Sequence, residues 1–160
     1  MNIYNYLIRN SIKFKNKNAL ILDKEKISYS TLINIVDYYS EEFLKKYNLK
    51  PNSKITVLME NSIDYVLLIL IACKLNITVQ TLGIYYSKKL INHRINKFKP
   101  KIIFTKKFFS YYFSAKQNNI KFFEYDQNLN RKKNNHKTYN FPKNKFNTEL
   151  LAVESSGTTG

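Results

Sequence analysis

Residues 63–75 form an almost continuously apolar run, which includes the stretch Tyr65-Val66-Leu67-Leu68-Ile69-Leu70-Ile71-Ala72-Cys73. A helix of this length is far shorter than the roughly 18 apolar residues that cross a bilayer, so it has to be buried on every side within a larger fold. Short strand-like runs stand before and after it, at Ile55–Met59 and Ile77–Leu82. The centre of the chain is therefore predicted to be a strand, a buried helix and a second strand.

The rest of the chain repeats this alternation. Helices are predicted where apolar residues recur every three or four positions, and strands where short apolar runs end at turn residues. The predicted helices span 2–14, 31–47, 63–75 and 88–98, with a short aromatic helix at 108–115. The predicted strands span 55–59, 77–82, 101–105, 120–125 and 150–153, and 19–22 with 26–29 form a small hairpin. This order predicts an α/β fold with a mainly parallel sheet and right-handed crossovers.

Capping residues support these helix boundaries. Ser30 is the predicted N-cap of helix 31–47, Asn61-Ser62 precede helix 63–75, and Ser87 precedes helix 88–98. Residues 127–147 contain no acidic residue and are rich in Asn and Lys, so they are interpreted as a polar surface loop, in part disordered.

The last predicted strand leads directly into a loop of small polar residues, Glu154-Ser155-Ser156-Gly157-Thr158-Thr159-Gly160. Of the three glycines in the chain, two lie in this loop, where they permit sharp turns and a close approach to a ligand. Hydroxyls and backbone N–H groups at such a turn make a donor site for anions. The loop is not a Walker A motif, because only two residues separate its glycines and no Lys follows. A disordered polar terminus is the alternative interpretation.

The net charge of +16 suggests a nucleic-acid or anionic-membrane partner. Only Arg9, Arg94 and Arg131 among the 27 basic residues are arginine, however, and the lysines are scattered along the chain. Arginine is the preferred residue for phosphate and guanine contacts, so no dedicated nucleic-acid surface is predicted. The single cysteine excludes an internal disulfide and a zinc cluster built on thiolates. No N-terminal segment has the pattern of a signal peptide, and a cytoplasmic location is expected.

Candidate catalytic side chains are few. His93 lies on the polar side of helix 88–98, and His136 lies in the polar loop without an identifiable partner. Cys73 is predicted to be a buried, inert thiol, and Glu60 and Asp64 are predicted to stabilise a helix start. The aromatic cluster at 108–113 is interpreted as core and partner-facing surface, with base stacking as the alternative. The sequence thus predicts neither a catalytic residue nor a metal ligand.

Several segments, in order, resemble the AMP-forming adenylating enzymes, the superfamily of acyl-CoA synthetases, aryl-CoA ligases, luciferases and peptide-synthetase adenylation domains. The segments that resemble its motifs are Ile27-Ser28-Tyr29-Ser30-Thr31-Leu32, Glu60-Asn61-Ser62-Ile63-Asp64-Tyr65, Pro100-Lys101-Ile102-Ile103-Phe104-Thr105 and Ser155-Ser156-Gly157-Thr158-Thr159-Gly160. The last is the specific one. The chain departs from the pattern at three places: Thr31 stands where Glu is usual, Lys74-Leu75-Asn76 replaces Lys-Ala-Gly, and Thr81 replaces Pro.

The resemblance implies activation of a carboxylate by ATP to an acyl-adenylate, then thioester formation with CoA, with Mg²⁺ as the metal. It assigns the ATP phosphates to Ser155, Ser156, Gly157, Thr158, Thr159 and Gly160. The Ser-Ser-Gly-Thr-Thr-Gly spelling favours acyl- or aryl-CoA ligases, and with them fatty acid metabolism, over peptide-synthetase domains.

The later parts of the family pattern, including the catalytic lysine, are absent. Residues 1–160 are therefore expected to be an N-terminal part of an adenylation domain, inactive alone, with the C-terminal part of the same enzyme as partner and a small-molecule carboxylate as substrate. The layers that cover the apolar helix are expected from later sequence, which predicts a sticky surface. The alternatives are a basic nucleic-acid-binding protein and a free-standing interaction module. The reading frame beyond the codon of Gly160 distinguishes a clipped enzyme from a split or remnant gene.

Overall fold

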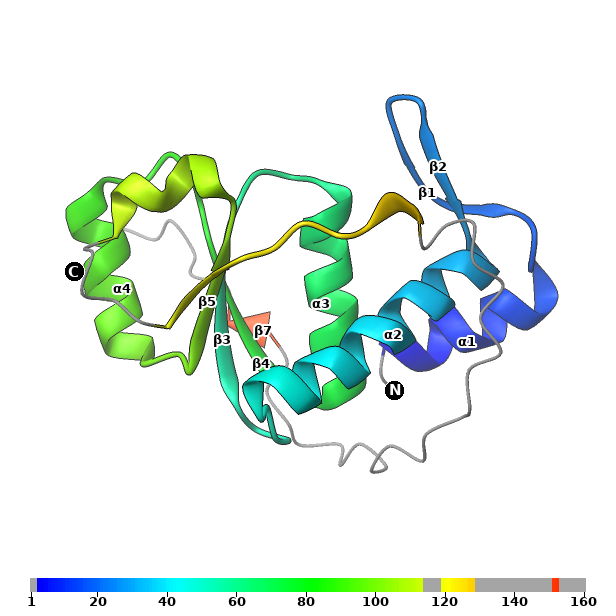
Figure 1. The fold of residues 1–160 in the computed structure, drawn as a ribbon, viewed down its shortest axis with the longest axis horizontal. Coiled ribbons are helices and arrows are strands. Elements are labelled where there is room, and N and C mark those ends of the chain that lie inside the picture. Colours follow the sequence, from blue (N-terminus) through cyan, green and yellow to red (C-terminus); the bar gives the residue numbers. More distant parts are fainter. Residues whose placement is uncertain (1–2, 114–118, 129–150, 153–160) are drawn as a thin grey trace.

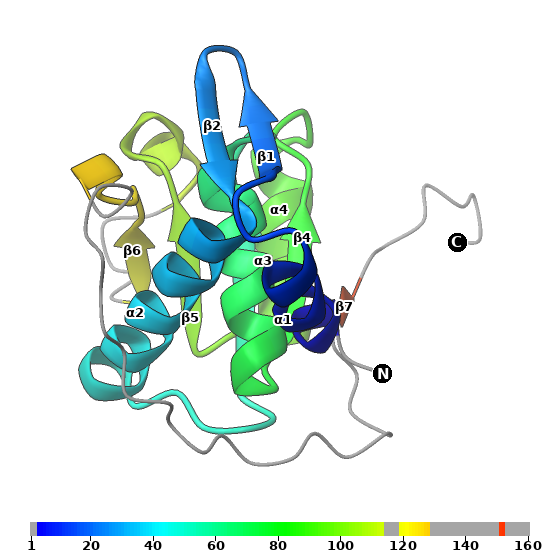
Figure 2. The same cartoon turned by 90° about the vertical axis from the view of Figure 1, so that its right-hand side faces the viewer.

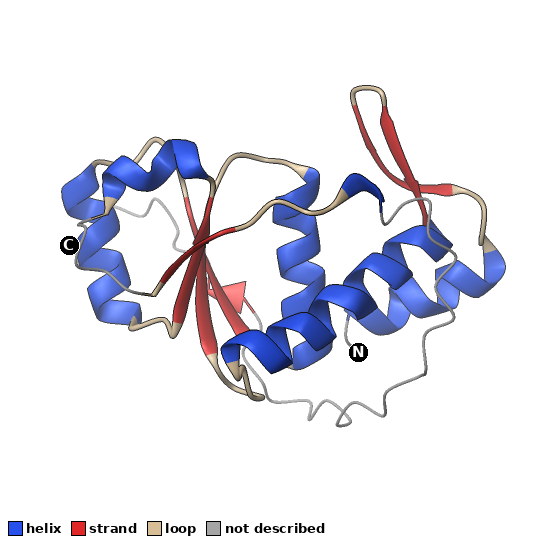
Figure 3. Cartoon of the chain, viewed as in Figure 1, coloured by secondary structure: helices blue, strands red, loops and turns tan. Residues whose placement is uncertain are grey.

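The computed structural model describes residues 3–113, 119–128 and 151–152 and shows an α/β architecture (Figures 1 and 3). The helices are α1 (Ile3–Lys13), α2 (Tyr29–Tyr47), α3 (Ile63–Leu75), α4 (Lys88–Phe98) and the 3₁₀ helix η1 (Lys107–Tyr112). The strands are β1 (Asn18–Leu22), β2 (Glu25–Ser28), β3 (Lys54–Leu58), β4 (Thr78–Leu82), β5 (Ile102–Thr105), β6 (Ile120–Phe122) and β7 (Leu151–Ala152).

The main sheet is parallel and has the strand order β6-β5-β3-β4-β7, which confirms the predicted fold class. β3 lies at its centre, with Ile55 opposite Val79 of β4 and Ile102 of β5. Both faces of such a sheet are covered, so its central strands are largely buried: within β3 and β4 only Lys54 is exposed and only Thr81 is half-buried. The hairpin β1–β2 is antiparallel and stands apart from this sheet.

Helices cover the sheet on opposite faces (Figure 1). α3 lies on one face with α1 and α2 beside it, and α4 and η1 lie on the other face. The expectation that later sequence covers α3 is therefore wrong for the described part of the chain. Nearly all of its side chains are buried, and only Tyr65, Val66 and Ile69 are half-buried, because α1 and α2 pack against it.

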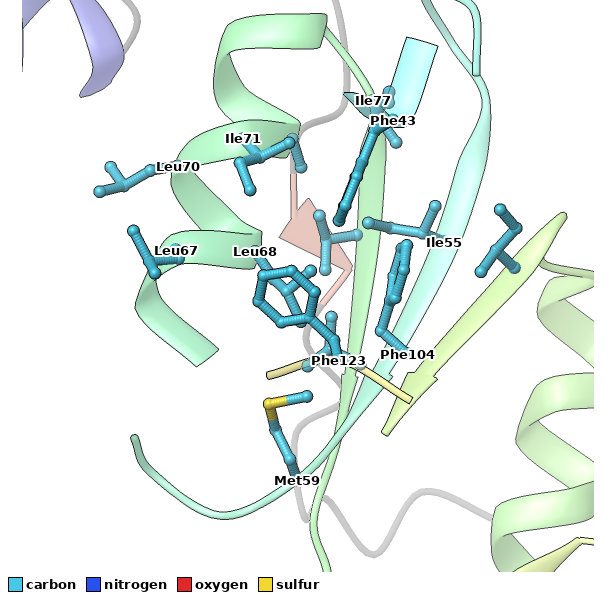
Figure 4. Close-up of a cluster of buried hydrophobic side chains, with 14 of the residues drawn as sticks. Phe43, Ile55, Met59, Leu67, Leu68, Leu70, Ile71, Ile77, Phe104 and Phe123 are labelled. Atoms are coloured by element: carbon cyan, nitrogen blue, oxygen red, sulfur yellow. The ribbon is translucent and has the colours of Figure 1, made fainter. Parts of the chain in front are cut away.

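Aromatic rings from three elements fill the core between α2 and the sheet (Figure 4). The ring of Phe43 stacks on that of Phe104 with centroids 4.9 Å apart and planes 11° apart. Phe123 meets Phe43 edge-on at 5.6 Å and Phe104 at 6.1 Å. Offset and edge-to-face pairs of this kind add to the free energy gained from burying the rings. They hold the segment after β6 against α2.

A serine caps the N-terminus of three of the helices. In each case its hydroxyl accepts a hydrogen bond from a backbone N–H of the first turn. Ser62 caps α3 and Ser87 caps α4, as predicted. The predicted cap Ser30 is wrong: Ser28 caps α2 through the backbone N–H of Thr31 at 3.2 Å. The hairpin causes the difference, because Ser28 pairs with Asn18 and is held in the extended conformation that a cap needs.

A polar contact joins α1, α2 and α3. Asp37 of α2 accepts a hydrogen bond from the hydroxyl of Tyr4 and one from Nζ of Lys74 at 2.6 Å. Lys74 is buried, and burial lowers its pKa while Asp37 raises it. Buried charges of this kind are tolerated when they are paired, so the contact fixes how the three helices dock.

Other boundaries differ by a few residues from the prediction. The aromatic helix expected at 108–115 is the 3₁₀ helix η1, and strand 120–125 is shortened to β6. Most of the polar loop 127–147 lies outside the described residues. No helix within the described ranges is long and apolar enough to cross a membrane.

Candidate functional site

All five parallel strands of the main sheet, β3, β4, β5, β6 and β7, end at one edge of it. β7 pairs with β4 through Val79–Leu151 and Gln80–Ala152, so it joins the sheet as a parallel neighbour. The polar loop motif begins three residues after Ala152 in sequence. Ser155, Ser156, Gly157, Thr158, Thr159 and Gly160 themselves lie outside the described residues.

At this edge the connections between strands switch from one face of the sheet to the other. The segment after β3 leads to α3 on one face, whereas the segment after the adjacent β4 leads to α4 on the other face (Figures 1 and 2). In open α/β sheets, ligands bind outside the carboxyl ends of the strands at such a switch point. The strand that leads to the motif, β7, is the other neighbour of β4. The last described strand before the motif, β7, is therefore part of the sheet whose carboxyl edge is expected to bind a ligand.

The segment that follows β3 is exposed at this edge before it enters α3. Met59 is buried, and Glu60 and Asn61 are exposed. The hydroxyl of Ser62 accepts the backbone N–H of Tyr65 at 3.2 Å. Glu60 precedes the first residue of α3 by three positions, and its predicted effect on the helix start stays a prediction.

The segment after β4 is held by side chains from α4 and η1. The hydroxyl of Tyr112 donates to the carbonyl of Ile84, and the guanidinium of Arg94 lies 4.3 Å from the centre of the Tyr86 ring. Asn92 donates to the carbonyl of Tyr112 at 3.3 Å, which ties η1 to α4. The aromatic cluster 108–113 is therefore partly structural: Phe109, Tyr112 and Phe113 are buried, and Phe108 and Tyr111 are exposed.

The end of β5 is bonded to the segments on both sides of it. The hydroxyl of Thr105 donates to the carbonyl of Leu58 at 2.7 Å. Lys106 donates to the carboxylate of Asp64 in the first turn of α3, and the same carboxylate accepts the backbone N–H of Tyr125 at 2.8 Å. Burial raises the pKa of Asp64, whereas the hydrogen bond and charge of Lys106 lower it. These bonds make the carboxyl edge a fixed platform.

The remaining candidate residues do not gather at this edge. His93 is exposed on α4, as predicted, and His136 lies outside the described residues. Cys73 is fully buried, as predicted, and burial raises its pKa to about 12; its lack of reactivity stays a prediction. Among residues 3–113, 119–128 and 151–152, no group of three or more His, Cys, Asp or Glu is placed to hold a metal ion.

A family model described as AMP-binding enzyme matches residues 8–160, which is nearly the whole chain and includes the loop motif. The chain belongs to the AMP-binding enzyme family. None of the curated proteins matches the sequence.

Solved structures of such enzymes have the same fold. The N-terminal subdomain of Klebsiella oxytoca NpsA, in complex with 3-hydroxybenzoyl-AMSN, matches with a TM-score of 0.80 and 16% identity over 99% of this chain and 39% of that one. Coronafacic Acid Ligase from Pectobacterium brasiliense matches with a TM-score of 0.65 and 18% identity, over 70% of this chain and 22% of that one. Mycobacterium tuberculosis fatty acyl CoA synthetase matches with a TM-score of 0.65 and 13% identity, over 69% of this chain and 22% of that one.

This chain therefore spans less than half the length of each of these solved structures. At such identities the likeness shows the fold alone.

From the sequence, Asp64 was predicted only to stabilise the start of a helix. Its bonds to Lys106 and to the backbone of Tyr125 join residues that lie 42 and 61 positions away. No local pattern in the sequence signals such partners, because they meet only after the parallel sheet has formed.

Proposed function

We propose that residues 1–160 are the N-terminal part of the adenylation domain of an ATP-dependent ligase that activates a carboxylic acid. The observation that carries the proposal is the family match, which extends through Gly160 and thus includes the phosphate-loop motif. The parallel sheet supports it, because β7 enters the sheet beside β4 and the motif follows it in sequence.

The motif has the chemistry that a polyphosphate needs. Ser155, Ser156, Thr158 and Thr159 offer hydroxyl and backbone N–H donors, and Gly157 and Gly160 permit the turns. These groups would bind and orient the phosphates of ATP, so that an oxygen of the carboxylate attacks the α-phosphorus and pyrophosphate leaves. In the second half-reaction a thiol displaces AMP from the acyl-adenylate, which gives a thioester.

Mg²⁺ and CoA are implied by the family. Within the described residues no cluster of His, Cys, Asp or Glu is arranged for a metal, so the chain's own ligands to Mg²⁺ are not assigned. Mg²⁺ would reach this part of the enzyme with the ATP phosphates, whose charge it neutralises. CoA is proposed as the thiol, because the sequence of the loop motif favours acyl- or aryl-CoA ligases over peptide-synthetase domains.

The substrate is proposed to be a small-molecule carboxylic acid. The solved structures of similar fold carry the names of a fatty acyl CoA synthetase, an acid ligase and an artificially fused Adenylation-PCP di-domain protein. The cytoplasmic location and the need for a C-terminal part of the same enzyme stay predictions.

Two measurements on the 160-residue chain test this proposal. We expect Mg·ATP to raise the unfolding temperature of the chain, and the variant Thr158→Ala/Thr159→Ala to lose this shift because phosphate donors are removed. The control Ser11→Ala/Ser110→Ala removes one half-buried and one exposed hydroxyl elsewhere and should keep the shift. We also expect no ATP–pyrophosphate exchange with any carboxylic acid.

The two results have separate meanings. An ATP shift that survives in Thr158→Ala/Thr159→Ala would remove the loop from the nucleotide site. Exchange activity in the unmodified chain would leave the reaction class intact and show that the chain is active alone.

A further inference from the structure

One end of the molecule exposes apolar side chains that the proposed reaction does not use. On α1, Tyr4 and Leu7 are buried toward the neighbouring helices, whereas Tyr6 is 50% and Ile12 is 80% exposed. On the hairpin, Ile21 is 62% and Leu22 is 42% exposed. α1 and the hairpin lie at the same end of the molecule, which faces the viewer in Figure 2. We call Tyr6, Ile12, Ile21 and Leu22, with the basic residues between Arg9 and Lys26, the N-terminal patch.

The charges of this patch have one dominant sign. Residues 1–22 contain no Asp or Glu, and the six basic residues from Arg9 to Lys26 are opposed only by Asp23 and Glu25. All six basic residues are exposed. Lysine and arginine side chains can lay their carbon stems along apolar surface while the charged ends reach outward, so cations and apolar groups coexist on such a face.

The segment between α1 and the hairpin fixes the patch to the rest of the fold. The carbonyls of Lys15 and Lys17 accept the backbone N–H groups of Ser30 and Tyr29 at 3.2 and 3.0 Å. The ammonium groups of Lys13 and Lys17 lie 5.2 and 5.0 Å from the centre of the Phe14 ring, within the range of cation–π attraction. The helix, the connecting segment and the hairpin therefore present their cations from one anchored structure.

We propose that the N-terminal patch binds the surface of a membrane that contains anionic lipid. An interfacial helix with basic residues and apolar side chains places the apolar groups about 5–10 Å into the boundary between headgroups and acyl chains, and anionic headgroups attract the cations. Ile12 and Ile21 are the apolar groups that would enter, and Arg9, Lys13, Lys15 and Lys17 are the cations that would meet the headgroups. The proposal does not depend on the nucleotide loop.

The other occupants fit the patch less well. A second copy of the chain would bring two strongly cationic faces together, and like charges in contact oppose association. A nucleic acid would match the cations, but its bases stack on aromatic rings, and of the four apolar residues of the patch only Tyr6 is aromatic, whereas Ile12, Ile21 and Leu22 are aliphatic. A lipid surface accepts both kinds of group at once.

Sedimentation of the 160-residue chain with lipid vesicles tests this proposal. We expect binding to phosphatidylcholine vesicles that contain phosphatidylglycerol, weaker binding in high salt, and little binding to phosphatidylcholine alone. Lys13→Gln/Lys17→Gln should weaken binding about 10- to 30-fold, since each lysine near an anionic surface contributes about fivefold. Ile12→Ser/Ile21→Ser should weaken it about tenfold or more by removing the inserted groups.

The control is Lys97→Gln/Lys107→Gln, which removes two exposed lysines from α4 and η1 at the opposite end of the molecule (Figure 1). It should change binding by less than about twofold, and thermal unfolding should show that every variant is folded. Equal loss in the control and in Lys13→Gln/Lys17→Gln would overturn the proposal in favour of general charge attraction. Absence of vesicle binding would also overturn it, whether the patch then binds a single-stranded oligonucleotide or a second copy of the chain.

Discussion

The carboxylate of Asp64, in the first turn of α3, accepts the backbone N–H of Tyr125 at 2.8 Å. The other oxygen of this carboxylate accepts a hydrogen bond from Lys106 at the end of β5. One buried side chain thus joins α3, β5 and the segment after β6 on the edge of the sheet where the ligand is proposed to bind. Its role is structural, as the sequence suggested, but its partners are distant.

We expect Asp64→Ala to destabilise the fold by about 2–4 kcal/mol, because the backbone N–H of Tyr125 and the ammonium of Lys106 would lose a buried partner. Glu124→Ala, which removes an exposed carboxylate from the neighbouring segment, should cost less than about 0.5 kcal/mol. Urea unfolding of both variants measures the difference. Equal values would show that Asp64 contributes no more than a surface carboxylate.

The pH dependence of stability should carry a signature of Asp64. Its pKa is raised by burial, so above pH 3.8 the folded state keeps a proton that the unfolded state releases. The stability of the unmodified chain relative to Asp64→Asn should therefore fall as the pH rises through the window above 3.8. Urea titrations of both proteins across this window measure it, and a constant difference would contradict a raised pKa.

Two neighbouring serines distinguish the observed helix cap from the predicted one. Ser28→Ala should cost about 1 kcal/mol, because the backbone N–H of Thr31 loses its acceptor. Ser30→Ala should cost only a few tenths of that, since the hydroxyl of Ser30 contacts Ser28 rather than a backbone N–H of the first turn. Thermal or urea unfolding measures the loss of stability in each variant. A larger loss in Ser30→Ala than in Ser28→Ala would show that Ser30 is the cap.

A buried side-chain pair joins the central strands. The hydroxyl of Thr56 on β3 donates to Oε1 of Gln80 on β4 at 2.9 Å, and both residues are buried. Thr56→Val should cost about 1–3 kcal/mol because it leaves the amide oxygen of Gln80 without this donor. Thr56→Val/Gln80→Leu should recover much of the loss by removing both polar groups. A double variant as unstable as the sum of the single ones would show that the two side chains are not coupled.

The thiol of Cys73 should not react with a thiol reagent in the folded chain at pH 8. Burial raises its pKa to about 12 from 9.0, so the reactive thiolate is much rarer in the folded chain than in the unfolded chain. Reaction should become complete in denaturing urea. Ser110→Cys, which places a thiol on the exposed part of η1, is the control that should react at once. Rapid reaction of Cys73 in the native chain would contradict its burial.

Local sequence patterns determined where most elements lie. The apolar run at α3, the caps Ser62 and Ser87, and the short runs at β3, β4 and β5 act over a few residues, so helix and strand types were predictable without a fold. The motif Ser155–Gly160 was predictable for the same reason, because its donors and glycines are contiguous.

Tertiary structure decided what depends on contacts between distant segments. The order β6-β5-β3-β4-β7, the cover of α3 by α1 and α2, and the bonds of Asp64 and Asp37 all join residues far apart in the chain. The cap of α2 is Ser28 rather than the predicted Ser30, because the pairing of Ser28 with Asn18 determines where β2 ends. Sequence alone determined the local elements and the family motif, whereas long-range packing determined which side chains meet, because such contacts form only once the sheet and its covering helices are assembled.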